Sequence, residues 1–230
     1  MHPSEKRIFV INPNSSTECT DGMDTALDDL RVDGAERIDC LTLEEAPPGL
    51  ECQRDVDGVV MPLCRLVQQH DNRAAAFVVA CYSDPGLHAV RETTRKPVFG
   101  IAESGMLTAM TLGDQVGIIA ILASGAARHA RYVRSIGIES RIAGEMAVGL
   151  GVTELADESV TLDRMTEAGR TLRDAHGADV LVMGCTGMAR YRERLETALE
   201  VPVVDPTQAA VGMAITAVRL GYSTAGRQSA

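Results

Sequence analysis

The chain has 230 residues, of which 45% are hydrophobic and 3% aromatic, so it can bury a full core and is not a disordered sequence. Its formal net charge of −10 argues against nucleic acid or an anionic membrane surface as a partner. The longest apolar run, VGIIAILA, is too short to span a bilayer, and the first residues lack the apolar core of a signal peptide. We therefore expect a cytoplasmic globular protein.

Apolar, β-branched runs alternate with helical patterns along the whole chain. The predicted strands cover residues 7–11, 36–41, 76–81, 97–101, 116–122, 138–142, 179–184 and 201–204. The predicted helices cover residues 16–31, 53–70, 85–95, 103–112, 126–136, 158–175, 188–199 and 207–220. Such alternation predicts an α/β fold with parallel sheets whose faces are covered by helices.

Four strand–helix units occur twice in the same order. The matched positions are Ile8 and Val116, Arg37 and Glu139, and Pro97 and Pro202, at offsets of 108, 102 and 105 residues. Any regular alternation of strands and helices gives similar spacings, but the matched prolines favour a duplication. We expect two pseudo-symmetric lobes, each with a four-stranded, mainly parallel sheet flanked by helices. Lobe 1 is predicted to comprise residues 1–112 and 207–230, and lobe 2 residues 113–206.

A cysteine ends one buried strand in each half of the chain. Cys81 ends the run AFVVAC, and Cys185 ends VLVMGC 104 residues later. Open α/β sheets hold their ligands at the carboxyl ends of strands, and the N-terminus of a following helix favours a thiolate. One such cysteine alone is more often a small core residue, but the matched positions favour two catalytic thiols. The other four cysteines are expected to be structural: Cys19, Cys40, Cys52 and Cys64. All six cysteines of the chain are expected to be reduced.

The loops after these two cysteines offer groups for a ligand. In CYSDPGL, Asp84 precedes a proline and is expected to cap the next helix, while amides near Ser83 and Asp84 point back to the cysteine. In GCTGM, Thr186 is expected to cap its helix, and Gly187 to let the backbone approach a ligand closely. We therefore predict substrate contacts by all four residues.

The turn after the first strand, VINPNSS, is a third candidate. Asn14 and Ser15 offer neutral donors for a carboxylate or an imide carbonyl, although they can equally turn the chain and cap the next helix. The corresponding turn in the second half, ILASG, places Ser124 near the same cleft. The sequence has no Walker A loop, no GxSxG elbow and no metal-ligand spacing. These patterns predict cysteine chemistry with no cofactor and no metal.

The elements VINPNSS, CYSDPGL, PVFGIAES and GCTGM resemble those of the hydantoin and allantoin racemases, within the aspartate/glutamate racemase superfamily. The resemblance runs from about Arg7 to about Leu220. It implies two α/β lobes with the active site between them, a homo-oligomer, and racemisation of a small molecule without a cofactor. The two catalytic cysteines of the family map to Cys81 and Cys185. Glu103 and Asp205 match positions that follow the family's fourth strands.

The implied reaction is a two-base racemisation of a 5-substituted hydantoin or of allantoin. One cysteine as thiolate removes a proton from one face, and the other as thiol protonates the opposite face. The chain departs from the family after the fifth strand, where threonines and a basic residue are usual. Ile121 and Leu122 stand there, with no arginine before Arg128, which predicts a more apolar wall. An aspartate/glutamate-type racemase, a related cysteine isomerase or arylmalonate-type decarboxylase, and a non-catalytic binding protein remain alternatives.

Overall fold

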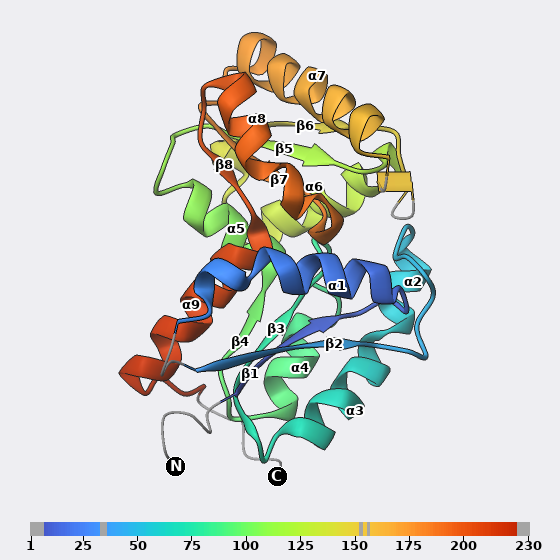
Figure 1. Ribbon diagram of the computed structural model, residues 1–230, viewed down its shortest axis with the longest axis vertical. Helices are drawn as coiled ribbons and strands as arrows, with labels where there is room; N and C mark the ends of the chain where they lie inside the picture. Colours follow the sequence, from blue (N-terminus) through green and yellow to red (C-terminus); the bar gives the residue numbers. More distant parts are fainter. Residues whose placement is uncertain (1–6, 33–35, 152–153, 156, 225–230) are drawn as a thin grey trace.

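The protein folds into two lobes, each built on its own four-stranded sheet (Figure 1). The structure, a computed structural model, describes residues 7–32, 36–151, 154–155 and 157–224. The first sheet contains β1 (Arg7–Asn12), β2 (Arg37–Thr42), β3 (Ala74–Val79) and β4 (Val98–Gly100). The second contains β5 (Val116–Ala120), β6 (Ile142–Ala147), β7 (Val180–Met183) and β8 (Val203–Val204).

Both sheets have the same topology. The strand order is β2-β1-β3-β4 in the first lobe and β6-β5-β7-β8 in the second, and every pair is parallel. Parallel neighbours need a crossover connection, which explains why a helical segment separates successive strands. The predicted fold class, two lobes with four-stranded parallel sheets flanked by helices, is confirmed.

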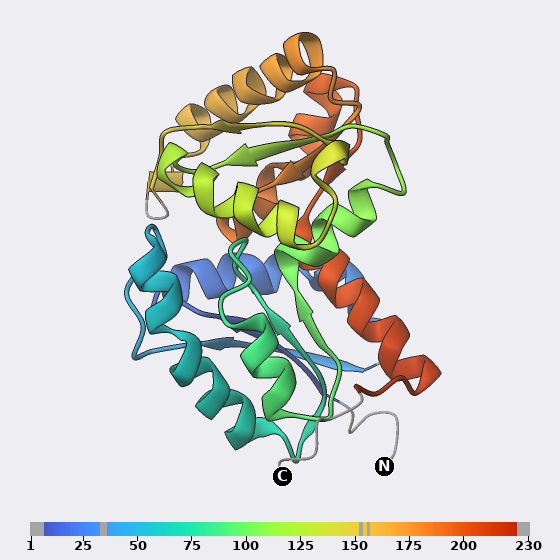
Figure 2. The same ribbon diagram turned by 180° about the vertical axis from the view of Figure 1, so that it is seen from behind.

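Alternate residues of each strand pack against different helices. In lobe 1, Phe9 and Ile11 of β1 face the layer of α2 (Gln53–Gly58), α3 (Val60–His70) and α4 (Leu87–Thr93). Ile8 and Val10 face the layer of α1 (Thr17–Ala26) and α9 (Pro206–Leu220). In lobe 2, one face carries α7 (Glu158–His176) and α8 (Arg192–Leu199), and the other carries α5 (Ile101–Ala109) and α6 (Ala126–Ser135). Figure 2 shows the helices and sheets of both lobes from behind.

Two helices near the junction of the lobes pack away from their sequence neighbours. Ala210 and Val211 of α9 lie in the core of lobe 1, although α9 follows the last strand of lobe 2. Ala102 and Met106 of α5 pack with β5 and β7 of lobe 2, although the predicted lobe 1 contains this helix. The predicted boundaries of the lobes remain a prediction.

The predicted strand over residues 138–142 is wrong. Residues Glu139–Arg141 form a short 3₁₀ turn, and β6 begins at Ile142. Cys40 pairs with Val10 in lobe 1, and Glu145 pairs with Ile118 in lobe 2, so the true offset between β2 and β6 is 105 residues rather than 102. The sequence of β6, IAGEMA, has few residues with strong β-propensity, and pairing with β5 determines where this edge strand lies.

Three predicted helices are each divided. The segment 16–31 forms α1 and then a 3₁₀ turn over Asp28–Leu30, and residues Thr186–Tyr191 form a 3₁₀ helix before α8. The segment 53–70 divides at Val59, because α2 ends at Gly58 and Pro62 lies in the first turn of α3. Proline has no N–H to donate, which is tolerated in a first turn but not in a helix interior. In the described residues, no helix is both long and apolar enough to cross a membrane.

Candidate active site

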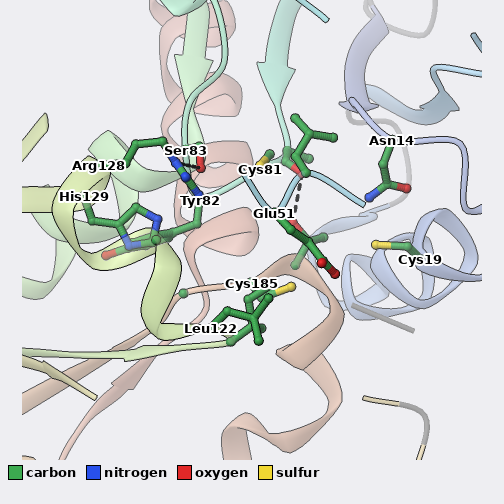
Figure 3. Close-up of a pocket in the computed structure, with 16 residues that line it drawn as sticks. Asn14, Cys19, Glu51, Cys81, Tyr82, Ser83, Leu122, Arg128, His129 and Cys185 are labelled. Carbon is green, nitrogen blue, oxygen red and sulfur yellow. Dashed lines mark hydrogen bonds between the residues drawn. The ribbon is translucent and has the colours of Figure 1, made fainter. Parts of the chain in front are cut away.

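A pocket lies between the lobes, where residues following β1, β3, β5 and β7 converge (Figure 3). The space among its lining atoms, counted with its opening to solvent, is about 570 Å³. Its walls combine side chains from both lobes: Asn14, Cys19, Leu50, Glu51, Ala80, Cys81, Tyr82, Ser83, Ile121, Leu122, Gly125, Arg128, His129, Gly184, Cys185 and Thr186.

Cys81 and Cys185 occupy equivalent positions in the two lobes. Cys81 lies two residues beyond the end of β3, and Cys185 lies two residues beyond the end of β7. Both line the pocket as free thiols, one from each lobe (Figure 3). The structure therefore brings two thiols, one from each lobe, to a single pocket.

The expected lowering of the thiol pKa values by helix N-termini does not occur. Burial raises the pKa of Cys81 to about 11 and also raises the pKa of Cys185. The helix after Cys81, α4, begins only at Leu87, so its N-terminus is six residues beyond the cysteine. The backbone N–H groups of Ser83 and Gly187 partly offset burial by hydrogen bonding to Cys81 and Cys185, respectively. Both thiols are protonated at pH 7 in the free protein.

The surroundings of the two thiols differ in charge. Burial and the Ser83 hydrogen bond have the largest effects on the pKa of Cys81. The negative charge of Asp84 raises this pKa further, and the positive charge of Arg128 lowers it. The pKa of Cys185 is raised further by Cys19, Cys81 and Asp205. Cys81 is therefore the thiol that ionises more readily.

Asp84 does not cap α4 as predicted. Its carboxylate accepts hydrogen bonds from the N–H groups of Ala102 and Glu103 at 3.0 and 2.9 Å, and from the hydroxyl of Tyr132 at 3.0 Å. The residue that precedes α4 is Gly86, and Asp84 instead satisfies the first amides of α5. Asp84 lies outside the pocket lining, and burial raises its pKa to about 7. Its carboxylate holds the cysteine loop in place rather than facing a ligand.

Thr186 also differs from its predicted role as a helix cap. Its hydroxyl donates a 3.0 Å hydrogen bond to the backbone carbonyl of Ala80, which belongs to the other lobe. Both residues are buried in the pocket wall. This bond joins the two loops that carry Cys81 and Cys185.

The remaining predicted ligand contacts are only partly brought to the pocket. Asn14 lines it, with its carbonyl oxygen accepting hydrogen bonds from the Asn12 side chain and the Ser16 N–H, both at 2.9 Å. Ser83 also lines it. Ser15, Ser124 and Gly187 do not belong to the lining, and the hydroxyl that caps α1 is that of Ser16.

Several polar pocket residues are absent from the predicted site. One is Cys19, which was expected to be structural and is the third residue of α1. Another is Arg128, which is the third residue of α6, so each follows a turn at the end of a strand. Extending the candidate turns NPNSS and ILASG by one helical turn would have identified both. Glu51 lies in the loop between β2 and α2, and the imidazole of His129 lies 2.9 Å from the carboxylate of Glu145.

Arg128 corrects the expectation of an apolar wall after the fifth strand. Ile121 and Leu122 line the pocket as expected, but Arg128 also lines it, and its Nε donates to the Ser83 hydroxyl at 3.1 Å. The pocket lining therefore includes a cation as well as these apolar side chains. In the described part of the chain, no group of three or more His, Cys, Asp and Glu side chains is placed to hold a metal ion.

The chain is similar to known racemases over nearly its whole length. The model of the Asp/Glu/hydantoin racemase family matches residues 8–214. A hydantoin racemase from Paenarthrobacter aurescens is 33% identical over 221 residues, which cover 95% of this chain and 93% of the relative. The structure of an allantoin racemase from Klebsiella pneumoniae is 30% identical with a TM-score of 0.90, covering 96% of this chain and 90% of that one. The structure of an allantoin racemase from Pseudomonas fluorescens is 27% identical with a TM-score of 0.92, and the match covers 97% of this chain and 98% of that one.

Proposed function

The chain belongs to the Asp/Glu/hydantoin racemase family, and we propose that it racemises 5-substituted hydantoins or allantoin without a cofactor, using Cys81 and Cys185. The observation that carries this proposal is the presence of two free thiols, from equivalent strand ends of two lobes, in one pocket. The names of the similar hydantoin and allantoin racemases support the substrate class.

The proposed reaction removes a proton from one face of a single carbon and delivers another proton to the opposite face. The thiolate of Cys81 removes the proton from C5 of the hydantoin ring, and the electron pair of the C–H bond moves into the C4 carbonyl. The thiol of Cys185 then protonates C5 from the opposite face, leaving Cys81 as a thiol and Cys185 as a thiolate. The opposite enantiomer reacts with the roles exchanged, which restores the starting protonation states.

The hydrogen bonds of the pocket divide between the sulfurs and the substrate. Because the N–H groups of Ser83 and Gly187 hydrogen-bond to the cysteine sulfurs, they stabilise whichever thiolate is present. The side-chain N–H₂ of Asn14 faces the pocket on the wall of lobe 1 and is suited to a ring carbonyl. A donor aimed at the developing enolate oxygen contributes about 2.7–4 kcal/mol to transition-state stabilisation.

The test is racemisation of pure L-5-methylhydantoin, L-5-benzylhydantoin and (S)-allantoin in deuterium oxide, followed by polarimetry and by NMR of the chiral carbon. We expect loss of rotation with deuterium incorporation at that carbon, and loss of racemisation in both Cys81→Ser and Cys185→Ser. The matched control is Cys52→Ser, since Cys52 is exposed and outside the pocket. The two-thiol assignment fails if either single variant retains near-normal turnover in both directions.

We also propose that the protein works in the cytoplasm as a homo-oligomer. The reaction needs two reduced thiols, which a reducing compartment maintains, and the resemblance to the hydantoin racemases supports assembly. Light scattering after size-exclusion chromatography tests the oligomer, because a monomer at micromolar concentration would contradict it.

A further inference from the structure

Arg128 is a distinctive feature of the pocket besides the pair of thiols. It is half-buried on α6 and lines the pocket, with Nε donating to the Ser83 hydroxyl at 3.1 Å. Among the residues that the structure describes, no carboxylate lies within ion-pair distance of it, whereas Arg134 on the same helix pairs with Glu139. The guanidinium is a pocket cation with one hydrogen-bond partner among the described residues.

An unpaired guanidinium in this position favours an anionic ligand. A guanidinium has five N–H donors, and Arg128 uses one of them on a neutral hydroxyl. Partial removal of a charge from water is unfavourable unless an opposite charge or good acceptors replace the lost solvent. The planar fork of the two terminal nitrogens matches the two oxygens of a carboxylate better than a single neutral carbonyl.

The arrangement of the pocket suggests which part of the ligand meets Arg128. Figure 3 shows Arg128 and Asn14 at opposite ends, with Cys81 and Cys185 between them. The reacting carbon must lie between the thiols, so its ring and its substituent extend in different directions. The side-chain N–H₂ of Asn14 suits a carbonyl of the ring. The substituent then extends towards the end of the pocket where Arg128 lies.

We propose that Arg128 determines specificity by selecting hydantoins whose 5-substituent ends in a carboxylate, such as 5-(2-carboxyethyl)hydantoin. This inference rests on the proposed racemase function and names its substrate class more closely. The methylene groups of such a substituent pack on the apolar wall of Ile121 and Leu122, and the carboxylate pairs with the free nitrogens of Arg128.

The experiment compares two substrates of equal size, 5-(2-carboxyethyl)hydantoin and its primary amide, with allantoin as a third, neutral ureido substrate. We expect wild-type kcat/KM for the carboxylate to exceed that for the amide by at least about tenfold, the effect of a charge-assisted hydrogen bond. Arg128→Gln should bring this ratio close to one, mainly through KM, and Arg128→Lys should restore part of it. Arg134→Gln, on the exposed side of α6, is the matched control and should leave the ratio unchanged.

Two results would overturn the inference while leaving the racemase function intact. One is a wild-type ratio near one, which needs no variant and so does not depend on the folding of Arg128→Gln. The other is an equal loss for all three substrates in Arg128→Gln, which would assign Arg128 to the ring or to the Cys81 thiolate instead. Absence of racemisation of every hydantoin and of allantoin by the wild-type protein would overturn the proposed function and this inference together.

Discussion

Replacing Thr186 with valine should weaken the junction between the two cysteine loops. The Thr186 hydroxyl donates at 3.0 Å to the carbonyl of Ala80, and the two residues are 4% and 2% exposed. Valine keeps the shape of the side chain but leaves this buried carbonyl without that donor. The penalty for a buried acceptor that loses its partner is about 1–3 kcal/mol. For a chain of this size it corresponds to a fall in Tm of roughly 2–12 °C.

A second threonine provides a matched control. Thr207 is 1% exposed, and its hydroxyl has no hydrogen-bond partner in the described structure. Thr207→Val removes a desolvated hydroxyl without breaking a bond, so Tm should stay the same or rise. Differential scanning calorimetry of both variants under the same conditions measures the difference. Equal losses of Tm would refute the reasoning, since they would reflect the threonine-to-valine change itself rather than the bond between the lobes.

The same variant has a kinetic consequence. The Thr186 hydrogen bond fixes the loop of Cys185 relative to the loop of Cys81, and small displacements of catalytic groups reduce rates steeply. At 25 °C, where Thr186→Val should remain folded, we expect slower racemisation in both directions. An unchanged rate would show that the spacing of the thiols does not depend on this bond.

Three further outcomes follow from burial and close packing. Burial raises the pKa of Cys81 to about 11 and also raises that of Cys185, so iodoacetamide should label both slowly at pH 7 and faster at higher pH. Site-resolved mass spectrometry measures the labelling, and rapid labelling of both at pH 7 would contradict this prediction. The same ionisation should make racemisation, corrected for the uncatalysed rate, increase above pH 7. Gly100→Ala should lower Tm because an added Cβ would lie 2.4 Å from the Asp84 carboxyl group. Gly212→Ala in the middle of α9, where an added Cβ would have no atom within 4 Å, should raise stability by about 1 kcal/mol. Similar changes in Tm from both variants would argue against a steric cause.

Features that depend on short stretches of sequence were predictable. The apolar runs that become β3 and β7 are buried on both faces, so their composition alone marks them as strands of a parallel sheet. The carboxyl end of such a strand is where an α/β fold exposes its site, which is why Cys81 and Cys185 were identified as a pair. The repetition of these units also predicted two lobes, each with a four-stranded, mainly parallel sheet.

Features that depend on contacts between distant segments of the chain could not be predicted from the sequence. The position of β6 follows from pairing with β5, because its own residues have little preference for a strand. Asp84 was assigned to the wrong helix because its partners, the first amides of α5, lie 18 and 19 residues further along the chain. The presence of Arg128 in the pocket depends on how α6 of one lobe meets the Cys81 loop of the other.

The sequence by itself determined the strand–helix alternation and the two cysteines at the strand ends, because each is encoded in residues that are neighbours in the chain. Tertiary structure alone decided the ionisation of those cysteines. A nearby helix N-terminus suggested lowered pKa values, but the protein atoms packed around each sulfur exclude water and raise them. The packing of both lobes around the pocket sets that desolvation, together with the neighbouring charge of Arg128 beside one thiol and not the other.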